Sequence, residues 1–351
     1  MRLSSRVNSR LLAAAIWLPW VPPDDPITPT LPPQPGVWTT AGELALLPTS
    51  GPAWNALFSA GNASLGSPRL RDIHDQTEIG VMARGLLYAR TGETHYRDEV
   101  IAACVAAMGT EREGTVLGLA RNLAGYVIAA DLVDLPPPVK GQFGRWLRDA
   151  LDEELDGRTL RTTHEDRPNN WGTHAGGSRA AVARYLGDDE ELARVARVFK
   201  GWLGDREAYS QFVFGPLWWQ SDPLAPVGIN PMGATLGGFS VDGVLPDDQR
   251  RSGQFFWPPP QENYVYEALQ GALLQAVVLH RAGYDVWEWE DQALLRAFTW
   301  LDVQAAFPAE GDDTGLPHVV NFYYGSNFPA PIPSQPGKNF GFTDWTHVPP
   351  P

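Results

Sequence analysis

Residues 75–92 read DQTEIGVMARGLLYARTG, and the apolar residues in this segment recur at the spacing of an α-helix. The residues that recur at intervals of three and four are Ile79, Met82, Leu86 and Leu87. Such a period predicts a helix with one face turned to a core. Gly92 follows the last apolar residue and is typical of a helix stop.

Similar helical patterns extend in both halves of the chain. We predict further helices over residues 96–108, 116–132, 139–155, 175–185, 190–203, 263–282 and 287–306. Helices of this length joined by short turns are typical of antiparallel hairpins. The intervening segment 206–260 and the final segment 307–351 are rich in Pro, Gly and aromatic residues and are expected to be loops.

These patterns predict an all-α fold in which helical hairpins form one ring, with long loops on one rim where sites usually lie. No change of composition marks a second globular domain. We therefore expect a single domain over residues 38–351, preceded by a leader and a proline-rich lead-in over residues 1–37.

Composition and charge narrow the class of protein. The net charge is −14 and no run of Lys or Arg is present, whereas nucleic-acid binding needs a basic surface. The same charge repels a polyanion at long range, so a site for an acidic polymer must gather Arg, Asn and His locally. The 14 Trp residues are typical of proteins that stack sugar rings on aromatic side chains.

The single Cys104 allows no disulfide within the chain, and no Cys/His cluster has the spacing of a zinc site. No apolar stretch is expected to reach the roughly 18–20 residues of a membrane span. Near the N-terminus, Arg2, Arg6 and Arg10 precede the apolar run 11–20, which is similar to a signal peptide without its usual cleavage site. We expect a secreted or periplasmic protein; the alternative is an amphipathic or disordered leader.

Residues 167–177, RPNNWGTHAGG, form the first segment that indicates chemistry. Asn-Asn-Trp-Gly is expected to interrupt a helix, and Thr173 is expected to cap a helix that starts near His174. The positive end of that helix favours a neutral imidazole at His174. Asn169 and Asn170 supply neutral donors for a carboxylate. The glycines that follow indicate close approach of another segment or a ligand, unless the whole segment is an ordinary polar loop.

Two later segments also attract attention. Tyr264 falls at a predicted helix start, where a nearby Arg would lower the pKa of the phenol and make a tyrosinate base accessible. The alternative for Tyr264 and Tyr266 is packing in a core. The closing segment 321–347, with Asn, aromatic and Gly residues, is expected either to fold over a groove or to clamp the ring shut.

Several of these motifs resemble those of alginate lyase-like proteins. NNWGT at residues 169–173 resembles the family's Asn-Asn-His-Gly-Thr signature. The stretch from Leu245-Pro246 through Arg251 to Tyr264 and the Ala-Leu-Gln at residues 268–270 is similar to its Leu-Pro…Arg…Tyr-His-x-Tyr-Ala-Leu-Gln block. TGETHY at residues 91–96 and GFTDW at residues 341–345 occur in matching order. The resemblance implies an incomplete (α/α) toroid and β-elimination of uronic-acid polysaccharides without an obligatory cofactor.

The resemblance also implies roles for single residues. Asn170 matches the Asn that neutralises the substrate carboxylate, and Tyr264 matches the Tyr that removes or delivers protons. Trp171 stands where the family has His, and His174 follows three residues later. Arg251 matches the family's Arg, although an aromatic and proline-rich insertion lengthens its spacing from Tyr264.

We therefore predict a polysaccharide lyase that acts on an acidic polysaccharide. The predicted catalytic residues are Asn170, His174, Arg251 and Tyr264, with His174 or Tyr264 as the base. The predicted substrate-binding residues are Asn169, Trp171, Arg121, Trp218, Trp219, Trp257 and Tyr323. A glycoside hydrolase is an alternative, because paired carboxylates would be available in loops: Asp222, Glu262, Asp313 and Asp344. A third alternative is a non-catalytic carbohydrate-binding protein.

Overall fold

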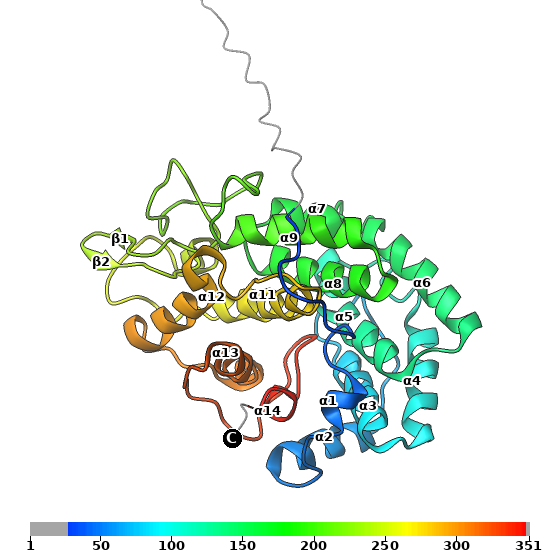
Figure 1. The fold of residues 1–351 in the computed structure, drawn as a ribbon. Helices are drawn as coiled ribbons and strands as arrows, with labels where there is room; N and C mark the ends of the chain where they lie inside the picture. Colours follow the sequence, from blue (N-terminus) through cyan, green and yellow to red (C-terminus); the bar gives the residue numbers. More distant parts are fainter. Residues whose placement is uncertain (1–26, 349–351) are drawn as a thin grey trace, which may run out of the picture.

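The computed structural model describes residues 27–348, and helices dominate them, as the all-α prediction requires (Figure 1). The helices are α1 (Ala41–Leu44), α2 (Pro52–Asn62), α3 (Thr77–Thr91), α4 (Thr94–Ala107), α5 (Val116–Val133), α6 (Pro137–Asp152), α7 (Leu160–Asp166), α8 (Asn170–Leu186), α9 (Asp189–Leu203), α10 (Pro246–Gln249), α11 (Tyr264–Arg281), α12 (Trp289–Thr299), α13 (Leu316–Tyr324) and α14 (Thr343–Thr346). The strands β1 (Thr235–Leu236) and β2 (Phe239–Ser240) form one short antiparallel hairpin within the long loop after α9.

Long helices that are buried along most of their length form the interior. They pack in the order α3, α5, α8, α11 and α13, each against the next (Figure 1). Helix α5 is buried on nearly all sides, which suits its almost continuous apolar sequence. Helices α4, α6, α9 and α12 lie outside this row; α4 contacts both α3 and α5, and α9 contacts both α8 and α12.

Helix α5 is the described helix that is long and apolar enough to cross a membrane, with an 18-residue window from Val116 to Val133. The expectation that no stretch would reach this length is therefore wrong on length and composition. However, 83% of that window is buried inside the protein. The apolar composition of α5 is thus explained by its central place in the helical core.

The neighbouring inner helices run in the same direction, so their N-terminal ends share one rim. Asn122, in the first half of α5, donates to the carbonyl oxygens of Leu70 and Asp72, just before α3 begins. His174 near the start of α8 lies beside Glu267 near the start of α11. Residues from four inner helices therefore meet at this rim, which we call the N-terminal rim.

The segment before and after α1 crosses the opposite rim, formed by the C-terminal ends of the same helices. The amide of Val37 donates to Asp131 at the end of α5 over 2.8 Å. Arg184 of α8 donates to the carbonyl of Gly36, and Arg281 of α11 binds the carbonyl of Pro35. Residues that were expected to form a lead-in are therefore packed onto the helical domain. The predicted signal-like run 11–20 lies outside the described residues.

The closing segment acts as a clamp, which was one of its two expected roles. Lys338 enters the interior and contacts Glu78 of α3 and Asn122 of α5, at 3.3 and 3.2 Å. Asn339 accepts a hydrogen bond from the amide of Gly125 and donates to the carbonyl of Ala120. This segment joins the two ends of the helical row from within.

Most predicted helices are confirmed within a few residues, and Gly92 ends α3 in the left-handed conformation, at φ 74°. The prediction for α8 is wrong at its start: the helix begins at Asn170, capped by Asn169, whose side chain accepts from the amide of Trp171. Thr173 lies inside the helix and is no cap. Helix α13 was predicted as loop; its proline lies in the first turn, where no amide hydrogen is needed.

Candidate active site

A chain of three ionisable side chains crosses the N-terminal rim from α5 to α11 to α8. Arg121 lies 3.0 Å from Glu267 (Nη2 to Oε2), and Glu267 lies 3.6 Å from His174 (Oε2 to Nε2). The second distance exceeds that of a hydrogen bond. Arg121 and Glu267 remain 14% and 17% exposed, whereas the His174 side chain is 1% exposed. The chain thus reaches solvent at its Arg121–Glu267 end.

Close packing of α8 on α11 creates this contact. A β-carbon on Gly271 would lie 2.3 Å from the carbonyl carbon of Thr173, so only glycine permits the approach. On the α8 side, a β-carbon on Gly176 would lie 2.4 Å from the side chain of Gln275. The glycines after His174 therefore admit α11, which is the first of the two partners expected for them.

Burial and neighbouring charge set the protonation states of this chain. Burial lowers the pKa of His174, and the nearby Arg121 guanidinium lowers it further, so the imidazole is neutral near pH 7. Burial opposes ionisation of Glu267, but His174 and Arg121 together hold the pKa of that carboxyl below its usual value. This direction agrees with the expected neutral His174, and burial is its largest cause. Neither ring nitrogen of His174 has a hydrogen-bond partner among the described residues.

The two asparagines at the start of α8 are buried and hold α10 in place. Asn169 donates through Nδ2 to Asp247 over 3.0 Å, and the backbone amide of Asn170 donates to Asp248 over 3.1 Å. Burial raises the pKa of Asp248 strongly, and the adjacent Asp247 raises it further. Asn170 itself is 2% exposed, so its amide lies behind the surface of the rim.

Tyr264 and Arg251 meet at the surface. The Arg251 guanidinium lies over the Tyr264 ring, 4.7 Å from its centroid. The side chain of Tyr264 is 43% exposed, and its backbone amide donates to Glu262. Because Tyr264 stands three residues before Glu267 on α11, the two side chains share a helix face. The structure therefore brings Arg251 and Tyr264 together on the face of α11 that carries the Glu267–His174 contact.

Further arginines concentrate positive charge at the same rim. Arg167 lies over the ring of Trp171, with 5.9 Å between the guanidinium carbon and the centroid. Burial lowers the pKa of Arg167, and the nearby Arg158 and Arg251 lower it further. The local gathering of Arg that an acidic chain needs for an acidic polymer is present here.

The aromatic residues predicted to stack sugars divide between several places. Trp257 stacks on Phe239 with 4.6 Å between ring centroids, and Trp218 is 42% exposed. Trp219 is fully buried and donates its indole N–H to the carbonyl of Gly253, so it belongs to the core and does not fit a stacking role. Tyr323 lies at the opposite rim and cannot join this site.

The carboxylates predicted for a hydrolase each have a structural partner nearby. Asp344 accepts from the amide and hydroxyl of Ser334, and Asp222 caps the turn at residue 224. Glu262 accepts from Ser252 and from the Tyr264 amide. Asp313 accepts from the Gln270 side chain, and burial and nearby carboxylates raise its pKa to about 8.

Sequence reasoning missed Glu267 and Asp248. Glu267 had a usable signal, because a residue three positions after Tyr264 must share its helix face. Asp248 had none, since its partner Asn170 lies 78 positions away in the sequence. Within residues 27–348, no group of three or more His, Cys, Asp or Glu side chains is arranged to hold a metal ion.

The fold and rim thus define an all-α protein of helical hairpins with an arginine- and tyrosine-lined site. The family model described as alginate lyase matches residues 78–207, which run from α3 to just past α9. This match confirms the resemblance to the alginate lyase family and supports a polysaccharide lyase-like function. It includes Arg121, Asn170 and His174, whereas Arg251 and Tyr264 follow it. A comparison with curated proteins finds no match.

Proposed function

We propose that the protein is a polysaccharide lyase that cleaves a uronic-acid-containing polysaccharide by β-elimination, on an incomplete (α/α) toroid. The observation that carries this proposal is the exposed Tyr264 under Arg251, one turn from the Glu267–Arg121 pair. A proton-transferring phenol beside guanidinium groups is the chemistry that a uronate demands. The match to alginate lyases over residues 78–207 supports the same reaction class.

Tyr264 is the group that contacts the reacting atoms in this proposal. Its phenolate oxygen takes the C5 proton of the uronate, and the electron pair left on C5 forms the C4–C5 double bond as the C4–O4 bond breaks. The proton then passes from Tyr264 to O4 of the leaving sugar. Proton transfers by a positioned side chain each contribute roughly 10²–10⁴-fold in rate.

Arg251 serves two purposes at this site. Its guanidinium, 4.7 Å from the centroid of the Tyr264 ring, holds that ring in place at the surface. With Arg121 it also stabilises the negative charge that accumulates on the uronate carboxylate as the C5 proton leaves. Such preorganised charge at a partly dry site is usually the largest contribution to catalysis.

His174 and Asn170 take positioning roles in this proposal, because both are nearly fully buried. His174 packs behind Glu267, 3.6 Å from its Oε2, and Glu267 in turn orients Arg121. Asn170 anchors α10 through Asp248 and so sets the place of Arg251, three residues further along. Of the two predicted bases, we therefore favour Tyr264 over His174.

The proposed substrate also indicates a location. Acidic polysaccharides are found outside the cytoplasm, and a polymer of that size does not cross a membrane. We therefore propose that the protein acts as a secreted or periplasmic enzyme, in keeping with the signal-like residues 2–20.

Ultraviolet absorbance tests the proposal, because β-elimination creates an absorbing C4–C5 double bond. Purified protein is incubated with alginate, polyglucuronate and acidic glycosaminoglycans. We expect absorbance to rise with one of these polymers. The rate of this rise should be about 10³-fold lower in Tyr264→Phe. Tyr266→Phe is the matched control: Tyr266 is buried and its hydroxyl donates to the carbonyl of Phe307, so activity should persist.

A glycoside hydrolase remains a second candidate because of one observation. The pKa of Glu267 is lowered, whereas that of Asp313 is raised to about 8, in part by the negative charge of Glu267. Two carboxyls whose pKa values are pushed apart can serve as base and acid. New reducing ends without absorbance, lost in Asp313→Asn but kept in Tyr264→Phe, would replace the lyase proposal with this one.

A further inference from the structure

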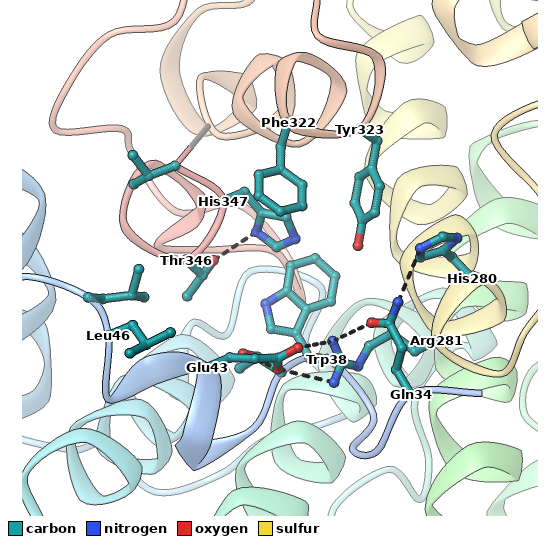
Figure 2. A pocket seen from close by; sticks show the side chains of 13 residues that line it. Gln34, Trp38, Glu43, Leu46, His280, Arg281, Phe322, Tyr323, Thr346 and His347 are labelled. Carbon is teal, nitrogen blue, oxygen red and sulfur yellow. Dashed lines mark hydrogen bonds and ion pairs between the residues drawn. The ribbon is translucent and has the colours of Figure 1, made fainter. Parts of the chain in front are cut away.

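A cavity of about 370 Å³ lies at the opposite rim from Tyr264, where the inner helices end (Figure 2). Helix α11 has 18 residues, so its two ends, and the two sites, are about 25 Å apart. Residues from the N-terminal segment, from the end of α11, from α13 and from the last turn of the chain line it: Trp38, Glu43, His280, Arg281, Phe322, Tyr323 and His347. Small-molecule pockets begin at about this volume.

The wall of this cavity is built and rigid. The two terminal nitrogens of Arg281 pair with the two carboxylate oxygens of Glu43, each at 3.1 Å. Arg281 also binds the carbonyl of Pro35 and the side chain of Gln34. Arg281 is 4% exposed, so this pair forms a fixed base for the cavity (Figure 2).

Several residues that line the cavity carry polar atoms without hydrogen-bond partners. The indole N–H of Trp38 has no hydrogen-bond partner among the described residues, although Trp38 is only 2% exposed. The same holds for Nε of Arg281 and Nδ1 of His280. These three atoms are closed off from solvent, whereas the Tyr323 hydroxyl, which has no hydrogen-bond partner among the described residues, points into the cavity and is open to a ligand (Figure 2).

The charges of the cavity cancel. Glu43 and Arg281 neutralise each other, and an incoming carboxylate would find both terminal nitrogens of Arg281 already occupied. Burial lowers the pKa of His347 to about 3, and burial also lowers the pKa of His280, so both imidazoles are neutral near pH 7. A neutral ligand is therefore favoured over an anion.

Aromatic side chains supply the remaining surface. Figure 2 shows Phe322 and Tyr323 on one side of the cavity and Trp38 between His347 and the Glu43–Arg281 pair. Tyr323 stacks on Trp287 with 4.1 Å between ring centroids, and this contact holds the Tyr323 ring in place at the cavity. Apolar ring surface combined with a few fixed donors matches a sugar, which has C–H faces and hydroxyl edges.

We propose that this cavity is a second carbohydrate-binding site, which takes one neutral pyranose unit and is separate from the N-terminal rim. The Tyr323 hydroxyl forms a hydrogen bond with a sugar hydroxyl, while the exposed ring of Phe322 contacts the sugar ring. This site does not depend on the lyase reaction, so it stands or falls on binding alone.

Calorimetric titration of the full chain tests the proposal with glucose, mannose, galactose and their methyl glycosides as probes, and glucuronate as the charged comparison. We expect one neutral sugar to bind in the millimolar range and to bind at least about fivefold more tightly than glucuronate. Tyr323→Phe should weaken binding about fivefold, which corresponds to the loss of one hydrogen bond. Tyr324→Phe is the control, because that hydroxyl bonds the carbonyl of Trp287 outside the cavity.

Circular dichroism establishes that each variant is folded, and Tyr264→Phe, at the other rim, should bind the sugar as the native chain does. Absence of saturable binding by every neutral sugar would overturn the proposal. So would a preference for glucuronate, or binding that Tyr323→Phe leaves unchanged. Loss of lyase activity in Tyr264→Phe with sugar binding intact would separate the two sites.

Discussion

Helices α8 and α11 meet so closely at Gly271 that an added methyl group has no room. A β-carbon there would lie 2.3 Å from the carbonyl carbon of Thr173 and 2.4 Å from the amide nitrogen of His174. These are backbone atoms of a buried helix and cannot move aside alone. Gly271→Ala must therefore push the two helices apart, and the Glu267–His174 contact lies at the same crossing.

Two opposing effects set the magnitude. Replacing a helical Gly by Ala favours the helix by about 1 kcal/mol. Overpacking of a close helix contact costs about 1–3 kcal/mol, and a clash with backbone lies at the upper end. We expect Gly271→Ala to lower the free energy of unfolding by about 2 kcal/mol. Gly141→Ala on α6 is the matched control: that glycine is exposed, and its β-carbon would meet only the end of the Arg145 side chain at 3.7 Å.

Urea unfolding followed by circular dichroism measures both variants, with midpoints compared at equal slope. Gly141→Ala should raise the stability by up to about 1 kcal/mol, whereas Gly271→Ala should lower it and reduce activity. If Gly271→Ala proves as stable as Gly141→Ala, α8 and α11 do not cross at this point, and the close approach of His174 to Glu267 would have to be abandoned with it.

Two further predictions concern buried charges. Asp313→Asn should gain stability relative to the native chain as pH rises from 5 to 8. In the folded native chain the Asp313 carboxyl holds its proton up to about pH 8, whereas its ordinary pKa is 3.8. The stability of the native chain therefore falls over this window by at most about 1.4 kcal/mol per pH unit. A difference between the two proteins that does not vary with pH would contradict this. Lys338→Met should cost about 3 kcal/mol by leaving Glu78 buried without its partner, and Glu78→Gln in the same chain should restore much of the loss; urea midpoints that are equal for the single and double variants would refute the pairing.

The inner helices were predictable because their apolar period is strong and their ends carry ordinary signals. Gly92 ends α3 where its sequence indicates. The start of α8 was misjudged because Asn169 can either interrupt or cap a helix, and the choice depends on Asp247, 78 positions away, which binds its amide. Helix α13 was missed because the whole segment 307–351 was predicted to be loop from its Pro, Gly and aromatic content.

The site was predictable only in part, for the same physical reason. Tyr264 and Arg251 lie near each other in the sequence, and their contact was expected. The pairing of Arg121 with Glu267 joins residues 146 positions apart and depends on how α5 and α11 are placed by α8 between them. Trp218 and Trp219 are neighbours in the sequence, yet Trp218 is 42% exposed and Trp219 is fully buried, so only the fold distinguishes a surface residue from a core one.

The parallel course of the inner helices explains how a chain of net charge −14 could hold an anionic polymer. Each helix carries a partial positive charge at its N-terminal end, within the first turn. Because α3, α5, α8 and α11 begin at one rim, these partial charges and the side chains of Arg167 and Arg251 are gathered on one side, where Arg121 is paired with Glu267. The opposite rim has the negative helix ends, and there Arg281 is neutralised by Glu43. The same helices thus favour an anion at one rim and a neutral ligand at the other, as the two proposed sites require.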